Sequence, residues 1–141
     1  NNWSHLYARR QWSLADSPFL RYGKLLAFDR KMIHLFRENN ILSQPPISIY
    51  NDEPRQILVM ERNGYVFVFN FSPSESYSNY RVNIFGGEYS VVLDTDWKEF
   101  NGFERNRKKQ IHYTQEDAEG TFLSLYLPAR SAFVLKRKLV K

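Results

Sequence analysis

The stretch from Arg62 to Phe71, which reads Arg-Asn-Gly-Tyr-Val-Phe-Val-Phe-Asn-Phe, constrains the fold of this chain more than any other. Asn63-Gly64 between two apolar runs predicts a β-hairpin with a type I′ turn, because both residues tolerate the positive φ that this turn needs. In the strand after the turn, aromatic residues alternate with valines, so both faces are apolar. A strand that is apolar on both faces must be covered on both, and we therefore expect it to be a central strand.

Composition favours one domain of mostly β structure. The 141 residues include eleven Phe, nine Tyr and three Trp, and aromatic residues favour strands. The absence of Cys excludes disulfides, thiolate metal sites and cysteine nucleophiles. The sequence has no apolar run near the ~20 residues that span a bilayer, and no signal peptide. We therefore expect no membrane partner, and nothing in the composition argues for an oxidising compartment. Because the first residues lack an initiator Met, we also expect a chain that is cut from a longer one or processed.

The net charge of +5 is concentrated in two basic runs, Arg105–Lys109 and Lys136–Lys138 with Lys141. A basic surface can bind nucleic acid, with a steep dependence on salt. Aromatic residues are not interleaved with basic ones beyond the first run, so we interpret both runs as solvated surface. The sequence favours no nucleic-acid partner.

Residues 1–42 have the pattern of helices. Asp16-Ser17-Pro18 predicts a helix start, and Asn39-Asn40 predicts its end, since Asn tolerates the left-handed conformation. A shorter helix is expected around Ser4 to Trp12. The longer helix carries an apolar stripe at helical spacing, made of Phe19, Tyr22, Leu25, Leu26, Ile33 and Phe36.

After the boundary at Ser43-Gln44-Pro45-Pro46, the apolar period changes from about 3.6 to 2. The predicted strands are Ile47–Tyr50, Ile57–Glu61, Tyr65–Phe71, Tyr80–Phe85, Tyr89–Asp94, Gln110–Tyr113, Phe122–Leu127 and Ala132–Lys136. Two of them predict an apolar face each, formed by Tyr89, Val91 and Leu93 and by Leu123, Leu125 and Leu127. Gly86-Gly87 is interpreted as a hairpin turn. Short strands at this spacing predict an antiparallel β-sandwich or partly closed barrel over residues 43–141.

Several runs resemble glycogen (1,4-α-glucan) branching enzymes, in the order in which that family has them. The matching runs are Tyr7–Leu14, Leu20-Arg21-Tyr22 with Leu25 and Phe28-Asp29, Val66–Pro73, Ser76–Val82, Val92–Asp96 and Tyr126–Ala132. The resemblance implies an all-β C-terminal domain of the α-amylase type, preceded by helices from the end of a (β/α)₈ catalytic barrel. This sequence differs from the family pattern at Asn79, where the family commonly has Asp. It also differs at Asn101-Gly102-Phe103, where the family tends to have Gly-Gly-His.

The resemblance implies transfer of an α-1,4-glucan chain to a 6-hydroxyl by the parent enzyme, with retention. That chemistry uses two carboxyl groups about 5 Å apart. In the family these residues lie on barrel strands upstream of residue 1, so no catalytic residue is assigned and the isolated chain is expected to be inactive. The resemblance also implies a cytoplasmic location. The partners of the chain would be the upstream barrel of the same polypeptide and α-glucan. An independent carbohydrate-binding module is the alternative.

Other candidate sites are interpreted as structural. Asp94-Thr95-Asp96 resembles an Asp-x-Asp metal motif, but it lies at a strand end, where Asp often caps a turn. His5, His34 and His112 lack the spacing of metal ligands, so neither a metal nor another cofactor is predicted. Arg9-Arg10 would fix the end of the barrel through carboxylates or carbonyls.

Aromatic side chains are the candidates for contact with glucan, because sugar rings stack on exposed aromatic faces. Burial is nevertheless the interpretation that we favour for most of them. Trp3 and Trp12 are expected to pack within the helical segment. The candidates for contact are Tyr77, Tyr80, Trp97, Phe100 and Phe103.

The covering of two apolar surfaces is also predicted. We expect the face formed by Tyr65, Phe67, Phe69 and Phe71 to lie in the core between two sheets. The face of Val66 and Val68 would pack on the helical segment or the missing barrel. The stripe formed by Tyr22, Leu25, Leu26, Ile33 and Phe36 is expected to pack on the β domain, or to join two copies of the chain, since a large solvated patch promotes association.

Overall fold

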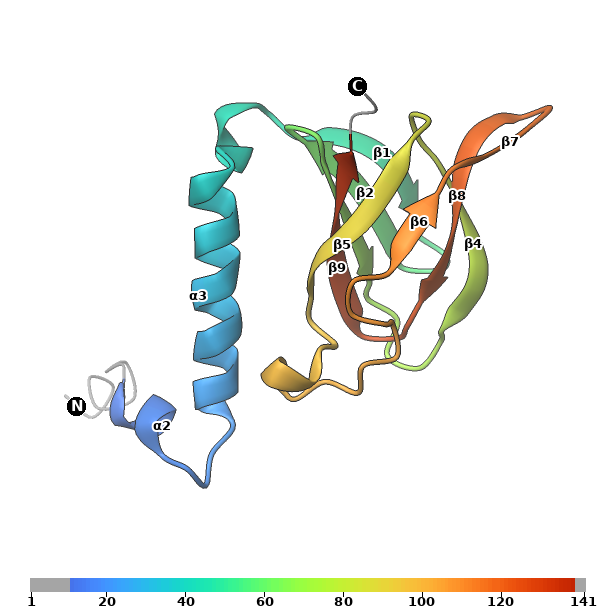
Figure 1. Cartoon of the computed structure of the whole chain (residues 1–141). Coiled ribbons are helices and arrows are strands. Elements are labelled where there is room, and N and C mark those ends of the chain that lie inside the picture. The colour runs from blue at the N-terminus through green and yellow to red at the C-terminus, as the bar shows by residue number, and fades with distance from the viewer. Residues whose placement is uncertain (1–10, 139–141) are drawn as a thin grey trace, which may run out of the picture.

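Two antiparallel sheets pack face to face, and one long helix lies along the outer face of the larger sheet (Figure 1). The computed structural model of the chain describes residues 11–138. The larger sheet has the order β1 (Ile47–Asp52), β2 (Ile57–Arg62), β3 (Tyr65–Asn70), β9 (Ser131–Lys138), β5 (Glu88–Asp94) and β6 (Ile111–Tyr113). The smaller sheet has the order β4 (Tyr77–Asn83), β8 (Gly120–Leu127) and β7 (Gln115–Asp117). The predicted antiparallel β-sandwich is confirmed.

The Asn-Gly hairpin forms as predicted and places β3 in the middle of the larger sheet. Asn63 and Gly64 have φ values of +50° and +77°, as a type I′ turn requires. The turn sets the register in which Arg62 pairs with Tyr65, and β9 pairs with the other edge of β3. Both faces of β3 are covered, because the second sheet lies on one side and the helix on the other.

The assignment of the two faces of β3 was wrong, because the aromatic face points to the helix and the valine face points into the sandwich. The ring of Phe67 lies 5.6 Å from that of Phe36 on the helix, and the Tyr65 hydroxyl donates to Asn39 Oδ1. Val66 and Val68 are buried in the core with the leucines of β8. Phe71 follows the end of β3 and is 61% exposed. The alternation of the strand predicted two buried faces, but which partner covers each face depends on long-range packing.

β-Bulges change which side chains share a face in two strands. The pairing of β5 with β9 shifts between Val91 and Leu93, so Leu93 turns to the helix side while Tyr89 and Val91 stay in the core. The prediction that these three residues share one face was therefore wrong. The same shift turns Asp94 towards the core. In β8, where no shift interrupts the alternation, Leu123, Leu125 and Leu127 are buried together as predicted.

The helical segment contains α2 (Ser13–Asp16), α3 (Tyr22–Glu38) and the 3₁₀ turn η1 (Ile41–Ser43). The helix α3 ends as predicted, with Asn40 at φ +49°, but it begins later than Asp16-Ser17-Pro18. Its N-cap is Arg21, which makes no side-chain capping hydrogen bond. Little of the shorter helix predicted around Ser4 to Trp12 can be compared, because Trp3, His5 and Arg9-Arg10, like all residues up to 10, lie outside the described range.

The apolar stripe predicted for α3 is only partly covered by the β-sandwich. Phe36 packs against the β-sandwich together with Phe28, Met32 and Leu35. Tyr22, Leu25 and Ile33 have 52%, 63% and 45% of their surface exposed. Leu26 is half-buried.

Two further details differ from the predicted strands. Gly86-Gly87 is not a hairpin turn, because β4 and β5 belong to different sheets and the loop between them crosses from one to the other. The short polar strand β7 was not predicted. Within residues 11–138 no helix is both long enough and apolar enough to cross a membrane.

Candidate functional site

Asp94 and Asp96 lie at the end of β5 and organise the long loop that follows it. Asp94 Oδ1 accepts a hydrogen bond of 2.7 Å from the backbone N–H of Asp96, which is the turn predicted for an Asp at a strand end. The Asp96 carboxylate accepts backbone N–H groups of Phe103 and Arg105 at 3.1 and 2.9 Å. Both carboxylates are buried and therefore act as structural acceptors inside the protein.

Arg105 completes the coordination of Asp96. Its Nε and Nη2 atoms each lie 3.0 Å from a carboxylate oxygen, and Nη2 also donates to the carbonyl of Ala129. Gly102 makes this arrangement possible, since a Cβ at that position would lie 2.2 Å from the carbonyl carbon of Asp96. Asn101 before it has φ +69°, which Asn tolerates where the family tends to have Gly. The loop is thus fixed around one buried carboxylate.

The pKa values of the two carboxyl groups are shifted in opposite directions. Burial raises the pKa of Asp94 to about 6. Burial would raise the pKa of Asp96 too, but the hydrogen bonds from Arg105 and from backbone N–H groups outweigh it and hold that pKa below its ordinary value. Asp94 Oδ2 has no hydrogen-bond partner among the described residues. No group of three or more His, Asp or Glu side chains within residues 11–138 is arranged to hold a metal ion.

Trp97 and Phe100, two of the predicted contact residues, lie beneath α3. Trp97 is 4% exposed and stacks on Phe100 at 6.1 Å, and the Phe100 ring meets Phe28 of α3 edge-on at 5.2 Å. Because these faces are occupied, neither ring is available for a sugar. Burial was the favoured interpretation of these two residues, but the sequence did not indicate what covers them, because the covering residues come from a helix about seventy positions earlier in the chain.

The ammonium groups of Lys31 and Lys108 lie over the indole ring of Trp97, and both also form ion pairs with Glu99. The Nζ atoms of Lys31 and Lys108 lie 4.9 and 4.8 Å from the indole ring centroid. They lie 2.9 and 3.2 Å from Glu99 Oε1. These hydrogen bonds, that of Lys31 first, hold the pKa of Glu99 below its ordinary value. The group connects α3 to the 3₁₀ turn η2 (Lys98–Phe100).

Phe103 is the candidate whose ring is open to solvent. Its side chain is 77% exposed, while its backbone N–H is held by Asp96. The Arg105 guanidinium carbon lies 5.6 Å from the ring centroid. The loop therefore presents one aromatic ring on a rigid backbone.

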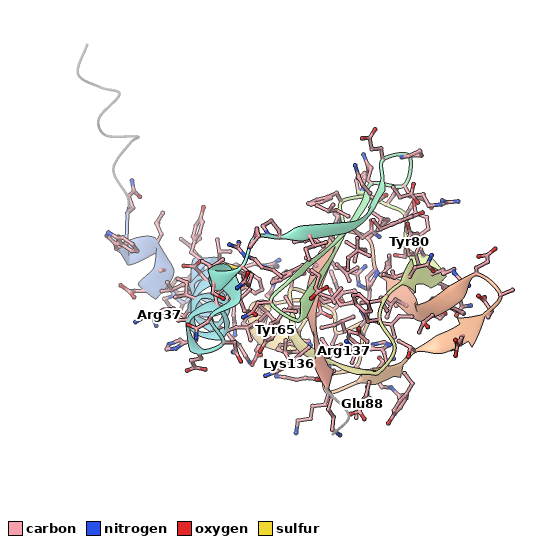
Figure 2. All side chains as sticks on the ribbon, turned by 90° about the horizontal axis from the view of Figure 1, so that it is seen from above. Arg37, Tyr65, Tyr80, Glu88, Lys136 and Arg137 are labelled. Carbon is pink, nitrogen blue, oxygen red and sulfur yellow. The ribbon has the colours of Figure 1, made fainter. Side chains whose placement is uncertain are left out.

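Tyr77 and Tyr80 form a second aromatic group, on the side of the sandwich away from α3, where Figure 2 labels Tyr80. A bulge between them turns both residues to the same face of β4, opposite Leu127 and Leu125. Asn79 within the bulge has φ +53°, a conformation that Asn and Asp both adopt readily. The two rings lie 6.0 Å apart, and Tyr50 of β1 lies 6.0 Å from Tyr80.

Polar partners that the sequence did not predict support this second group. Asp52 accepts the Tyr80 hydroxyl at 2.9 Å and the guanidinium of Arg55 at 3.0 Å, while the Tyr77 hydroxyl donates to the Arg55 carbonyl. Arg55 holds the pKa of Asp52 below its ordinary value. Burial, followed by the hydrogen bonds of Tyr50 and Asp52, raises the pKa of Tyr80. Tyr50 and Asp52 are two positions apart in β1, but the predicted strand ended at Tyr50, so the period-2 pattern did not extend to Asp52.

The remaining candidates do not form a site. His34 is exposed on α3 near Glu38, and burial lowers the pKa of His112. Trp12 is 66% exposed in a part of the chain where we predicted packing. In the first basic run, Arg105 and Lys108 bind carboxylates of the same loop.

Comparison with known proteins assigns the chain to a family. Residues 48–138 match the family described as "Alpha amylase, C-terminal all-beta domain". The chain is 40% identical to the 1,4-alpha-glucan-branching enzyme of Saccharomyces cerevisiae over 98% of its length, and 37% identical to that of Candida glabrata over 99%. The corresponding enzyme of Dictyostelium discoideum is 40% identical over 97% of the chain.

The matched region is a small part of each relative. The chain spans 20% of the length of the two yeast enzymes and 21% of the Dictyostelium enzyme. The match lies in the C-terminal fifth of these relatives, in agreement with the β-sandwich and the order of the motifs. The chain belongs to the family of alpha-amylase C-terminal all-beta domains.

Proposed function

We propose that this chain is the non-catalytic C-terminal portion of a cytoplasmic 1,4-α-glucan branching enzyme and stabilises the catalytic part that precedes it. The observation that carries the proposal is the match to the C-terminal fifth of branching enzymes. The two neighbouring carboxylates of the loop support it, because both are buried and Asp96 is already bound by Arg105. A glycosidase pair needs an open cleft with room for a sugar.

The division of labour within the chain is part of the same proposal. Residues 1–42 would belong structurally to the catalytic part, and residues 43–141 would form the supporting β domain. The outward side chains Tyr22, Leu25 and Ile33 of α3 support this, because exposed apolar groups on one helix face are typical of a surface that another element covers. Two copies of the chain could use the same face, and the mass of the isolated chain in solution distinguishes the two arrangements.

The test of the proposal is the branching of amylose, measured as the fall in iodine absorbance. We expect no change with the isolated chain. A chimera that joins the first four-fifths of the S. cerevisiae enzyme to this chain should branch amylose. Branching by the isolated chain would contradict the assignment of catalysis to the upstream part.

A second function, binding of α-glucan by this chain, is favoured by the exposed ring of Phe103 and by the group formed by Tyr50, Tyr77 and Tyr80. Aromatic rings with adjacent hydrogen-bonding groups are suited to bind a sugar, and the exposed guanidinium of Arg55 supplies such a group. Migration in a gel that contains glycogen tests this function. We expect retardation that Phe103→Ala or Tyr50→Ala weakens, while Phe85→Ala, another exposed aromatic position, leaves it unchanged. Unretarded migration of the unmodified chain would exclude the function.

A further inference from the structure

The middle of α3 does not pack tightly on the larger sheet. A cavity of about 210 Å³ lies between them, with an almost entirely apolar lining. The side chains that approach it from α3 are Phe28, Met32 and Phe36, and those from the sheet include Phe67, Phe69 and Ala132. Protein interiors seldom leave apolar space of this size unfilled. An apolar cavity of about 150 Å³ is large enough to bind benzene, so this one can hold an aromatic or branched aliphatic side chain.

The helix is fixed at both ends and so cannot settle into the cavity. Near its start, Phe28 packs on Phe100, and Lys31 binds Glu99 at 2.9 Å. At its end, Asn39 accepts the Tyr65 hydroxyl, and the Asn63 side chain donates to the carbonyls of Asn39 and Asn40. Figure 2 shows Tyr65 between the helix and the sandwich. The cavity is thus preformed and does not depend on an occupant for its shape.

The lining of the cavity continues into the segment that leads to β1. Pro46 is part of the lining, and Ile47, the next residue in the chain, is 62% exposed. The lining contains one charged side chain, Arg62. Its hydrogen-bond donors are already used, because Nε and Nη2 donate to the carbonyls of Gln44 and Leu42 at 2.6 and 3.0 Å. An occupant therefore gains by burying hydrocarbon and has no free charge to pair with.

We propose that this cavity is the socket for an aromatic or branched aliphatic side chain from the polypeptide upstream of this chain. The inference rests on the proposed function. Four-fifths of each relative lies before the matched region. That polypeptide would enter through the helical segment, whose α3 forms one wall of the cavity. Tyr22, Leu25 and Ile33 of α3 are exposed and add further apolar surface to the same helix.

The first experiment asks whether the cavity is open in the isolated chain. Benzene should raise the Tm of the chain by several degrees, because a ligand that binds the folded state stabilises it. Ala132→Leu adds three carbons within the cavity and should raise Tm on its own and abolish the response to benzene. Ala118→Leu, at an exposed turn between β7 and β8, should leave the response unchanged. A chain that does not respond to benzene would overturn the proposal.

The second experiment identifies the occupant in the chimera with the upstream four-fifths of the S. cerevisiae enzyme. If an upstream side chain fills the socket, benzene no longer raises Tm, and Ala132→Leu lowers Tm because the space is already occupied. If Ala132→Leu raises Tm in the chimera as in the isolated chain, the upstream part does not use the socket. An isolated chain that is dimeric and becomes monomeric with Ala132→Leu would assign the socket to a second copy and overturn the proposal.

These outcomes separate the inference from the proposed function. A chimera that branches amylose while its cavity still binds benzene leaves the proposed function standing and refutes the socket. A chimera that does not branch amylose counts against the proposed function itself. The same holds if the chimera that carries the control substitution Ala118→Leu is inactive.

Discussion

Asp94 and Asp96 are two residues apart and both buried, yet their pKa values are displaced in opposite directions. The difference follows from their partners. Asp96 binds the guanidinium of Arg105, whereas Asp94 Oδ2 has no hydrogen-bond partner among the described residues. Asp96 therefore stabilises the fold in its charged form, whereas for Asp94 the folded state favours the protonated form.

Asp94→Asn should stabilise the protein at neutral pH. The folded state keeps the Asp94 proton up to about pH 6, and the unfolded state releases it near 3.8, so this group costs stability as the pH rises between these values. Asn cannot ionise. The gain in free energy of unfolding should therefore be small near pH 4 and reach at most about 3 kcal/mol above pH 6. Urea unfolding of both proteins between pH 4 and 7.5 measures it, and a difference that does not change with pH would contradict the origin in ionisation.

Arg105→Met should destabilise the chain, because Asp96 would remain buried with backbone partners alone. We expect a loss of about 2 kcal/mol in free energy of unfolding, reduced from the value for a fully buried pair because Arg105 is partly exposed. Since the pKa of Asp96 is lowered in the folded state, the loss should diminish as the pH falls below 4. Arg107→Met, in the same exposed loop, is the matched control and should change stability by less than about 0.5 kcal/mol. Equal effects of the two substitutions would argue against a specific role of Arg105.

Gly102→Ala should disturb the loop because its Cβ would collide with the backbone of Asp96. We expect a cost of about 2 kcal/mol or more in free energy of unfolding, since backbone has to move. Gly86→Ala is the control, because the nearest atom to its Cβ lies 3.7 Å away on the side chain of Thr121. If both variants unfold at the same temperature as the unmodified chain, the close approach at Gly102 is not a constraint.

Glu99→Gln should weaken the attachment of α3 to the loop. The substitution removes the anion shared by Lys31 and Lys108, which are both partly exposed, so the expected loss is about 0.5 kcal/mol and should shrink at high salt. Glu116→Gln, at another exposed position, should have no effect. Chemical denaturation at low and high NaCl measures both variants. An effect of Glu99→Gln that is independent of salt would indicate a packing change instead of a lost ion pair.

The sequence predicted the central hairpin because its signal is local. The Asn63-Gly64 turn depends only on backbone preferences, and the alternation after it requires two covered faces. The end of α3 at Asn40 was predictable for the same reason. The strand β7 was missed because its residues, Gln-Glu-Asp, are polar and exposed, so the period-2 signal is absent.

Contacts between distant segments were not predictable from periodicity. The burial of Trp97 depends on α3, and the bulges that turn Leu93 to the helix and bring Tyr77 and Tyr80 to one face interrupt the regular alternation. The aromatic face of β3 was assigned to the wrong partner because helix and sheet offer equally apolar surfaces. The turn formed by Asp94 and Asp96 was predicted, since an Asp at a strand end caps a turn by a local hydrogen bond.

The central claim, that this chain supports a catalytic part upstream of it, is tested most directly by the iodine assay on amylose with two proteins. One is the first four-fifths of the S. cerevisiae enzyme alone, and the other is the same part joined to this chain. We expect little or no branching by the first and clear branching by the second, with slower thermal inactivation. Equal activity and equal thermal inactivation of the two proteins would contradict the claim.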